Sequence, residues 1–203
     1  DSDGVQLINN LVGTRANGIY PLGNQHLGVR VGRSRAVVLN GNTIAYNMGQ
    51  GLSLWDAPSN DPAVPGFVPS QVTLSGGSMH SNEQLGIDLI VDGDPVVYGL
   101  TGNDAGDGDS GPNGLVNFPV LESAKWDGTH VELTGIVEGA GVATRVDIYA
   151  NTYCDLNGYG EGQLHVGHVD VVGNGTFSWS GESPESVGRM LTATATTFEG
   201  TSE

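Results

Sequence analysis

The sequence predicts an all-β protein in which a short parallel β-helix is followed by an antiparallel β-sandwich. Three observations carry this prediction. Glycine accounts for 33 of the 203 residues and aromatic residues for only 6%, which is typical of chains built from turns and short strands. A short phrase recurs at a regular spacing in the first half of the chain. Longer stretches of alternating apolar and polar residues occupy the second half.

The recurring phrase places an asparagine four residues before a glycine, and a branched aliphatic residue directly after that glycine. It occurs at Asn24–Val29, Asn47–Leu52 and Asn82–Ile87, and a fainter copy begins at Gly4. The glycines at positions 4, 28, 51 and 86 are therefore 24, 23 and 35 residues apart. A period of ~22–25 residues with two-residue alternation is too short for a helical repeat. It fits one coil of a β-helix, with three short strands and three turns.

Each predicted coil buries its aliphatic side chains only by stacking on the next coil. The clear coils span residues 4–31, 36–54 and 72–91, and the whole β-helix is expected within 1–100. Glycine supplies turn conformations that other residues adopt only at a cost. Asparagine tolerates left-handed backbone and can bond to the equivalent residue one coil away. The repeated Asn and Gly residues are therefore expected to be structural.

An insertion at 55–68 interrupts the period between the second and third coils. It contains three prolines within eight residues, so it cannot form a central strand. Its Trp55 and Phe67 are the candidate ligand-binding residues, because long loops at the side of a solenoid are common places for binding. Two interpretations are open. The aromatic rings cover the side of the coil, or they contact a sugar or a protein partner.

The segment 101–117 is an acidic, glycine-rich linker and carries the candidate metal site. Side-chain oxygens are concentrated there, on Asn103, Asp104, Asp107, Asp109 and Asn113. Ca²⁺ binds about six to eight oxygen ligands, and a glycine-rich loop can bend several carboxylates around one ion. The pattern differs from an EF-hand loop. We expect either a calcium site, to which Asp92 and Asp94 could add ligands, or a solvated acidic turn between two domains.

From residue 118 onward the repeat is absent and longer alternating stretches take its place. They span 130–136, 143–149, 163–172, 176–179 and 190–196, with turns of Gly, Asn and Asp between them. Antiparallel strands at this spacing are typical of a β-sandwich, expected here over 118–203. The predicted core consists of the inward residues Val131, Leu133, Val146, Ile148, Leu164, Val166, Phe177, Trp179 and Leu191.

Composition limits the partners of this chain. The formal net charge is −16, and a strongly acidic surface repels nucleic acid and anionic lipid. There is no run of about 18 apolar residues, so no membrane span is expected. The single cysteine, Cys154, cannot form an internal disulfide and is expected to be packed. The first residue is Asp1 and no secretory signal is present, as in a processed or excised form.

Several motifs, taken together, resemble large secreted bacterial surface proteins. They are Asn10–Thr14 with Leu22–Asn24, Gly86–Leu89, Asn103–Leu115 with Asn117–Leu121, Tyr149–Thr152 with Cys154–Asp155 and Gly158–Gln163, and Leu191–Thr196. In that family, right-handed parallel β-helix coils of the pectate-lyase-like type run into a small immunoglobulin-like domain. The resemblance implies an all-β fold with a short right-handed parallel β-helix and an antiparallel Ig-like β-sandwich. It also implies an extracellular or cell-surface location, and a role in adhesion or surface structure.

A catalytic role has little support in the sequence. Polysaccharide lyases with the same helix use calcium-bridged acidic sugars and an Arg or Lys base, which Arg30, Arg33 or Arg35 could supply. The acidic loop follows two coils later, so we expect no carboxylate cluster beside these arginines. His165 and His168 lie three apart on one strand, which should place them on opposite faces and prevent a shared metal. No Ser–His–Asp or Cys–His set stands out.

We therefore expect a non-enzymatic extracellular surface protein, either an adhesin segment or a self-assembling fibre subunit, stabilised by Ca²⁺. The first coil has no cap in the sequence, so its strand edge is expected to be open. Stacking of subunits end to end would then build a homo-oligomer or a filament. A glycan or cell-surface partner at Trp55 is a further expectation. The alternative is a polysaccharide-binding or polysaccharide-cleaving protein that resembles the lyases.

Overall fold

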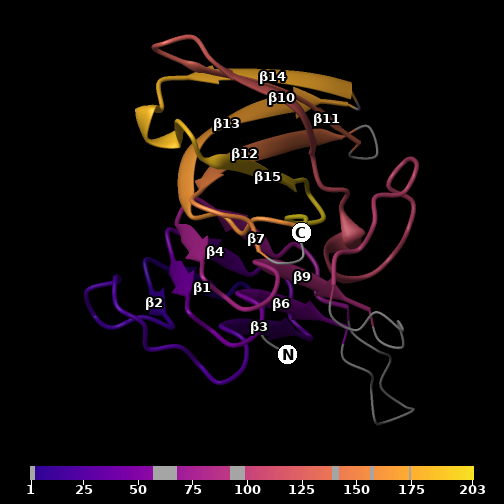
Figure 1. Ribbon diagram of the computed structural model, residues 1–203. Coiled ribbons are helices and arrows are strands. Elements are labelled where there is room, and N and C mark those ends of the chain that lie inside the picture. The colour runs from indigo at the N-terminus through magenta and orange to yellow at the C-terminus, as the bar shows by residue number, and fades with distance from the viewer. Residues whose placement is uncertain (1–2, 57–67, 92–98, 139–141, 156–157, 174) are drawn as a thin grey trace.

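The computed structural model describes residues 3–56, 68–91, 99–138, 142–155, 158–173 and 175–203 and has two stacked parts (Figure 1). Three small parallel sheets form one part, and two antiparallel sheets form the other. Helical structure in the described residues is limited to two short 3-10 segments, η1 (Pro112–Leu115) and η2 (Pro184–Ser186). The predicted fold class, a parallel β-helix followed by a β-sandwich, is confirmed.

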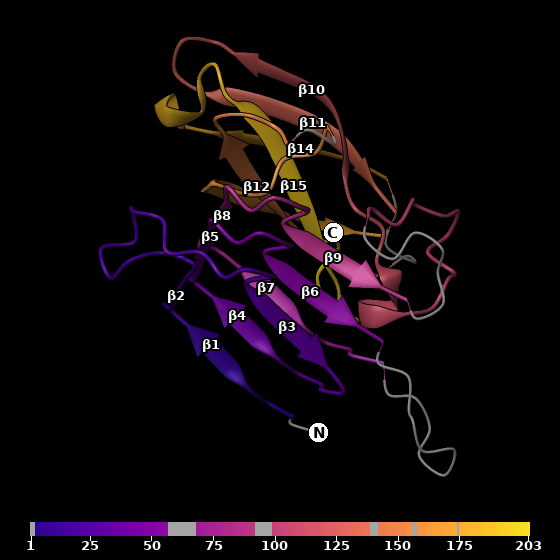
Figure 2. The same ribbon diagram turned by 60° about the horizontal axis from the view of Figure 1, so that its bottom comes forward.

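The β-helix consists of three coils, each built from three short strands (Figure 2). The first coil contains β1 (Gln6–Ile8), β2 (Leu11–Val12) and β3 (Val29–Gly32). The second contains β4 (Val38–Asn40), β5 (Thr43–Ala45) and β6 (Leu52–Trp55). The third contains β7 (Thr73–Ser75), β8 (Ser78–His80) and β9 (Ile87–Ile90). Equivalent strands pair in parallel, giving the sheets β1-β4-β7, β2-β5-β8 and β3-β6-β9.

Aliphatic side chains stack in columns through the interior of the coils. Each column takes one residue from each coil at the same register, as in Leu7–Leu39–Leu74, Val12–Ile44–Met79, Val29–Leu52–Ile87 and Val31–Leu54–Leu89. Members of the second coil are almost fully buried, because they have a neighbour on both sides. Fully burying such a side chain contributes about 1.5–3 kcal/mol, so a coil is stable only within a stack.

The repeated glycines mark one corner of the stack, at the entry to the third strand of each coil. The N–H of Gly28 donates to the carbonyl of Gln50 at 2.9 Å, and the N–H of Gly51 donates to that of Leu85 at 3.1 Å. Gly4 does not share this corner. Its N–H donates to the carbonyl of Arg35 at 3.0 Å, just before β1. The prediction that Gly4 begins a copy of the repeated phrase is therefore wrong. The segment between β2 and β3 is longer than the one between β5 and β6, so the distance from Gly4 to Gly28 equals the repeat period by coincidence.

The sandwich pairs the sheet β10-β11-β14 with the sheet β13-β12-β15. The first sheet contains β10 (Val120–Trp126), β11 (Val131–Val137) and β14 (Gly175–Gly181). The second contains β12 (Ala143–Asn151), β13 (Leu164–Val172) and β15 (Met190–Thr196). Of the predicted core, Leu133, Val146, Ile148 and Phe177 form the buried centre, with Val166, Trp179 and Leu191 packed at its margin. Val131 is also buried, whereas Leu164 is half-buried.

A bulge in β13 changes the expected facing of two histidines. Opposite β12, His168 pairs with Asp147 and His165 pairs with Tyr149. Asp147 and Tyr149 are two residues apart on β12, so they share one face, and the two histidines therefore share a face as well. The expectation that the histidines point to opposite sides is wrong, because the extra residue of the bulge, Val166, shifts the alternation by one.

The sandwich sits on the third coil, with the sheet β13-β12-β15 toward the β-helix (Figure 1). Val72, at the entry to β7, forms a parallel bridge with Gly200. Met79 of β8 forms an antiparallel bridge with Gly162, and an N–H of β9 donates to the carboxylate of Glu203 at 2.7 Å. Segments of the sandwich thus take the places that the strands of a fourth coil would take.

Candidate metal centre and the helix–sandwich junction

The acidic loop is folded back against residues 117 and 118 by two amide side chains. The side chain of Asn103 accepts a hydrogen bond from the N–H of Phe118 at 2.9 Å and donates to its carbonyl at 2.8 Å. In the same way, the side chain of Asn117 accepts a hydrogen bond from the N–H of Asp104 at 2.9 Å and donates to the carbonyl of Asp104 at 2.8 Å. The amide of Asn103 is therefore used to shape the loop. The sequence reasoning missed Asn117.

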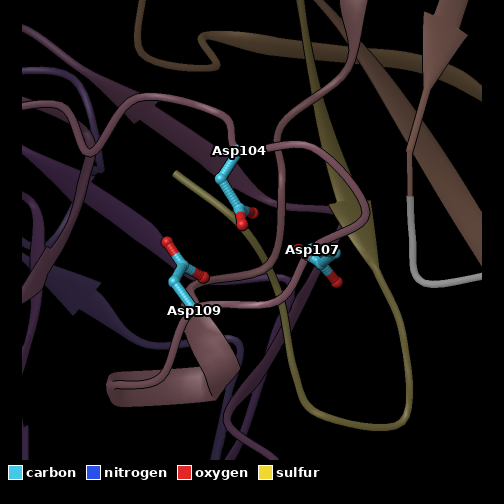
Figure 3. A group of neighbouring side chains, drawn as sticks. All are labelled: Asp104, Asp107 and Asp109. Carbon is cyan, nitrogen blue, oxygen red and sulfur yellow. The ribbon is translucent and has the colours of Figure 1, made fainter.

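This fold brings three carboxylates together at the tip of the loop (Figure 3). One oxygen from each of Asp104, Asp107 and Asp109 lies within 4.8 Å of the others. The carboxylate of Asp104 accepts from the N–H of Gly108 at 3.1 Å, and that of Asp107 accepts from the N–H of Asn117 at 2.8 Å. The first two aspartates are half-buried and the third is exposed, so solvent can reach the cluster from one side.

The pKa values reflect the crowding of these negative charges. Burial raises the pKa of Asp107, the hydrogen bond from Asn117 opposes that effect, and the charge of Asp104 adds to it. Burial also raises the pKa of Asp109, and the charges of Asp104 and Asp107 raise it further. A bound cation would remove this repulsion. Three carboxylates with the remaining positions filled by water match the oxygen-rich shell that Ca²⁺ takes, so the residues present fit the predicted ion.

Asn113, the fifth predicted ligand, is not part of this cluster. It lies in η1, is almost fully buried, and its amide joins two other segments of the chain. The side-chain oxygen accepts from the N–H of Val72 at 2.9 Å. The side-chain nitrogen donates to the carbonyls of Val72 and Thr201 at 2.8 and 2.9 Å. Asn113 thus fastens the linker to the start of β7 and to the segment after β15. Asp92 and Asp94 lie outside the described residues.

The candidate ligand residue Trp55 is the last residue of β6 and stacks between Gly32 and Ile90 of the neighbouring coils. It is half-buried, and the guanidinium carbon of Arg30 lies 5.1 Å from its ring centroid. This geometry is that of a cation–π contact, which partly occupies one face of the ring. Trp55 is therefore a strand residue of the second coil, and ligand binding by its ring stays a prediction. Phe67 lies outside the described residues.

A cavity of about 580 Å³ lies beside the acidic loop. Its lining includes Arg35, Asp56, Asp107, Asp109 and the exposed ring of Phe198. Arg35 and two aspartates of the cluster therefore line one cavity, although the acidic loop follows two coils later in the sequence. The reason is tertiary, because the linker folds back along the coil stack.

A ladder of asparagines runs along one corner of the β-helix. The backbone N–H of Asn24 donates to the side-chain oxygen of Asn47, and that of Asn47 donates to the side-chain oxygen of Asn82, both at 3.1 Å. The N–H of Asn82 then donates to the carboxylate of Glu161 at 2.9 Å. Glu161 precedes β13 and belongs to the sandwich side of the junction. Its carboxylate ends the ladder, a role that sequence reasoning missed.

A second carboxylate ends the β3-β6-β9 sheet. Glu203 accepts hydrogen bonds from the N–H groups of Leu89 and Thr101, one to each oxygen. Asp88, adjacent on β9, is almost fully buried and accepts from the side chain of Gln50 at 2.8 Å. Burial raises the pKa of Asp88 to about 6, opposed by the bonds from Gln50 and from the backbone of Gly99. The junction therefore contains carboxyl groups with few counter-charges.

An ion-pair cluster lies on the face of β12 that carries the two histidines. The carboxylate of Asp147 is fully buried and accepts from the guanidinium of Arg145 at 2.8 and 2.9 Å. Its Oδ1 also lies 2.7 Å from Nε2 of His165. Burial tends to raise the pKa of Asp147, but the bonds from His165 and Arg145 outweigh it, so the pKa is lowered. The cluster positions β12 and β13 relative to each other.

No protein-family model matches the chain. The fold therefore defines its class on structural grounds alone: over the described ranges, it is a three-coil parallel β-helix whose third coil is covered by a six-stranded β-sandwich. Both helices that the described residues form are single 3-10 turns, and neither has the length or apolar character to cross a membrane.

Proposed function

We propose that the protein is a non-enzymatic extracellular module, an adhesin segment or fibre subunit of a surface structure. The observation that carries this proposal is the difference between the two ends of the coil stack. The third coil is covered by the sandwich, whereas β1, β2 and β3 pair on their outer side with no strand among the described residues. The resemblance of the sequence motifs to bacterial secreted proteins with right-handed β-helix and Ig-like domains supports this role.

The first coil has the properties of an assembly edge. Its strands expose unpaired backbone groups, and the side chains of Val5, Ile8 and Leu11 are 39–49% exposed. Edges of this kind pair with other chains unless they are blocked. We propose a second copy of the chain as the partner. Because the third-coil edge is covered, the coil stacks of two copies would pair through their first coils, and such a self-complementary contact closes at a dimer. A filament built by stacking requires the sandwich to leave the third coil.

Light scattering after size exclusion tests this proposal over a range of protein concentrations, first with Ca²⁺ and then with a chelator. We expect a concentration-dependent dimer that Ile8→Lys abolishes, because a charge on the outer edge of β1 opposes pairing. The matched control is Val172→Lys, which adds the same charge at an exposed position on the sandwich. A monomer at high concentration in both buffers would contradict assembly through the first coil and leave the adhesin segment as the function.

A second candidate function is the binding of an acidic polysaccharide, favoured by the cavity that Arg35 shares with Asp107 and Asp109. A calcium ion on the aspartates and the guanidinium of Arg35 would both attract the carboxylates of uronic acids. Binding of oligogalacturonate and of alginate oligomers is measured by calorimetry with Ca²⁺ and with a chelator. Calcium-dependent binding that Arg35→Ala weakens supports this function, and product release would extend it to cleavage. The absence of heat with both ligands would contradict it.

A glycan or protein partner at Trp55 is tested separately. A glycan array is probed with the wild-type protein and with Trp55→Ala. Because Arg30 already covers one face of the ring, we expect equal signals from the two proteins. A signal that is lost in Trp55→Ala would instead assign ligand binding to this side of the coil.

A further inference from the structure

The segment between β2 and β3 forms an ordered hairpin that projects from the first coil (Figure 2), here called the hairpin 13–22. Thr14 and Pro21 form an antiparallel bridge across it. The hydroxyl of Tyr46, on the second coil, donates to the carbonyl of Ile19 at 2.9 Å. Because these contacts fix the backbone, little conformational freedom is lost when the hairpin meets a partner.

The side chains near the tip of the hairpin 13–22 are apolar and open to solvent. Ile19, Tyr20 and Leu22 are 67%, 58% and 66% exposed. Arg15, which is also exposed, adds a positive charge to the same hairpin. Single exposed apolar residues are common on protein surfaces, but three on one ordered projection mark an interaction site.

The charge of the chain changes sign near the end of the second coil. Residues 4–55 contain four arginines and no aspartate or glutamate. Residues 56–203 contain three of the seven basic residues and all but two of the 23 acidic residues. The hairpin thus belongs to a basic part of an acidic chain, and the later part of a second copy is its electrostatic complement. An apolar and acidic recess is the surface that suits the hairpin.

A cavity of about 690 Å³ at the helix–sandwich junction, here called the junction cleft, offers such a surface. Its described lining contains the acids Glu83, Asp88 and Asp155, the apolar side chains of Leu85 and Leu100, the ring of Tyr159, and no Lys, Arg or His. Cavities of about 300–1,000 Å³ take up drug-sized ligands, which are comparable with a few side chains. The junction cleft therefore combines a suitable size with an apolar lining and negative charge.

Two other cavities suit a basic hairpin less well. The cavity beside the acidic loop already contains Arg35, and a cavity at the edge of β10 is lined by Lys125 and Arg189. The positive charge of Arg15 would meet like charge in both places.

The hairpin 13–22 and the junction cleft lie at the same corner of the coil stack, on different coils. The hairpin precedes β3 of the first coil, and residues 82–85 of the cleft precede β9 of the third. The asparagine ladder from Asn24 to Asn82 runs along this corner through the second coil. A contact of the hairpin with the cleft of another copy joins two different surfaces, and such heterologous contacts propagate into rings or filaments.

We propose that the hairpin 13–22 of one copy docks in the junction cleft of the next, with Ile19 and Tyr20 against the apolar lining. The guanidinium of Arg15 then meets the carboxylates of Glu83 and Asp155. This inference rests on the proposed role as a fibre subunit and names the contact by which the fibre grows. Because the contact uses a corner of the coil stack, the fibre grows with the sandwich still docked on the third coil.

Light scattering after size exclusion at about 0.15 M salt tests the contact. The full chain carries Ile8→Lys, so that pairing through the first coil is removed and the hairpin contact is measured alone. We expect the mass to rise with protein concentration, above the range in which the first-coil dimer forms. Arg15→Glu and Glu83→Arg should each raise the required concentration at least about tenfold, because each sets like charges against each other. Both substitutions in one chain should restore assembly, because they reverse the pair.

The matched controls are Lys125→Glu and Glu122→Arg, which make the same charge changes at exposed positions of β10, outside the hairpin and the cleft. Both should assemble like the parent that carries Ile8→Lys alone. A parent that stays monomeric at high concentration would overturn the proposal, and so would equal assembly of the Arg15→Glu and Lys125→Glu chains. Failure of first-coil pairing is read separately, from the comparison of the wild type with Ile8→Lys.

An anionic lipid surface is the competing partner, because it also attracts exposed apolar and basic side chains. Surface anchors of that kind are rich in Lys and Arg, whereas the hairpin 13–22 has Arg15 alone. Cosedimentation with phosphatidylcholine–phosphatidylserine vesicles tests this partner. Vesicle binding that Ile19→Ser abolishes, without self-association in solution, would assign the hairpin to a lipid surface and overturn the proposal. Protein that stays in the supernatant while its mass rises with concentration supports the contact between copies.

Discussion

The carboxylate of Glu161 stands 2.9 Å from the backbone nitrogen of Asn82, in the place that the side-chain oxygen of Asn82 takes against Asn47. A residue 79 positions later in the chain therefore completes a ladder that begins in the first coil. The contact ends the coil repeat and fixes the sandwich to it at the same time. The stability of the β-helix and the position of the sandwich are coupled through this pair.

The ladder predicts a large effect of substituting its central asparagine. In Asn47→Ala, the N–H of Asn24 loses its acceptor and the side-chain oxygen of Asn82 loses a donor. Because Asn47 is fully buried, we expect the free energy of unfolding to fall by about 1–3 kcal/mol, measured by urea denaturation. Asn24→Ala, at the exposed end of the ladder, is the control and should cost less. Equal losses in the two variants would contradict a buried ladder.

Close packing at the glycine corner predicts a second loss of stability. A Cβ on Gly51 would lie 2.6 Å from Sδ of Met79 and 2.8 Å from the carbonyl oxygen of Gly86. We expect Gly51→Ala to lower the free energy of unfolding by about 1–3 kcal/mol through overpacking. Gly102→Ala is the control, since a Cβ there meets no atom within 4 Å. Thermal and urea unfolding of both variants measure the difference, and a neutral Gly51→Ala would show that neighbouring coils can move apart.

The aspartate cluster predicts stabilisation by calcium. At a free Ca²⁺ concentration about 20 times the dissociation constant, we expect a gain of about 1.8 kcal/mol in the free energy of unfolding. Asp107→Asn and Asp109→Asn should reduce the gain, because each removes one carboxylate from the group. Asp127→Asn, on the exposed turn after β10, should leave it unchanged. Identical unfolding curves in calcium and in chelator would show that the loop is a solvated acidic turn.

The buried carboxylate of Asp147 predicts a dependence of stability on acid. The pKa of Asp147 is lowered from its ordinary value of 3.8. The ion pair of Asp147 with Arg145 and His165 therefore stabilises the fold fully above about pH 3.8, and this stability is lost as the pH falls through the lowered pKa. We expect Asp147→Asn to lose about 2 kcal/mol at neutral pH and to be less sensitive to acid than the wild type. Urea unfolding from pH 2.5 to pH 7 measures this, with Glu122→Gln as control. Parallel pH profiles for wild type and Asp147→Asn would contradict it.

Local features of the sequence were enough to predict the coils and the acidic cluster. The repeated Asn and Gly residues recur at one corner because each coil repeats the same backbone path, so the period is visible in the sequence. Asp104, Asp107 and Asp109 lie within one short loop, so their proximity follows from chain connectivity alone. The alternation that predicts the sandwich strands is equally local.

Features that depend on distant segments were missed or misassigned. Asn113 resembles a loop ligand in the sequence, yet its partners lie 41 and 88 residues away. His165 and His168 share a face only because a bulge shifts the register of β13 against β12. Gly4 lies at the distance from Gly28 that the repeat predicts, but it lies before β1 and not before β3. The extra residues of the first coil make this distance equal to the period. None of these outcomes has a signal in the neighbouring residues.

The amino-acid sequence alone was sufficient for the coil period, the change from parallel to antiparallel strands and the cluster of carboxylates, because short-range alternation and turn residues encode them. The covering of the third coil, the capping of the ladder by Glu161 and the cavity that Arg35 shares with Asp107 arose only from tertiary structure. These contacts depend on where the sandwich docks. Docking depends on how well the two surfaces fit and on acceptors for the backbone N–H groups that it buries. Neither requirement can be predicted from the residues next to each other in the sequence.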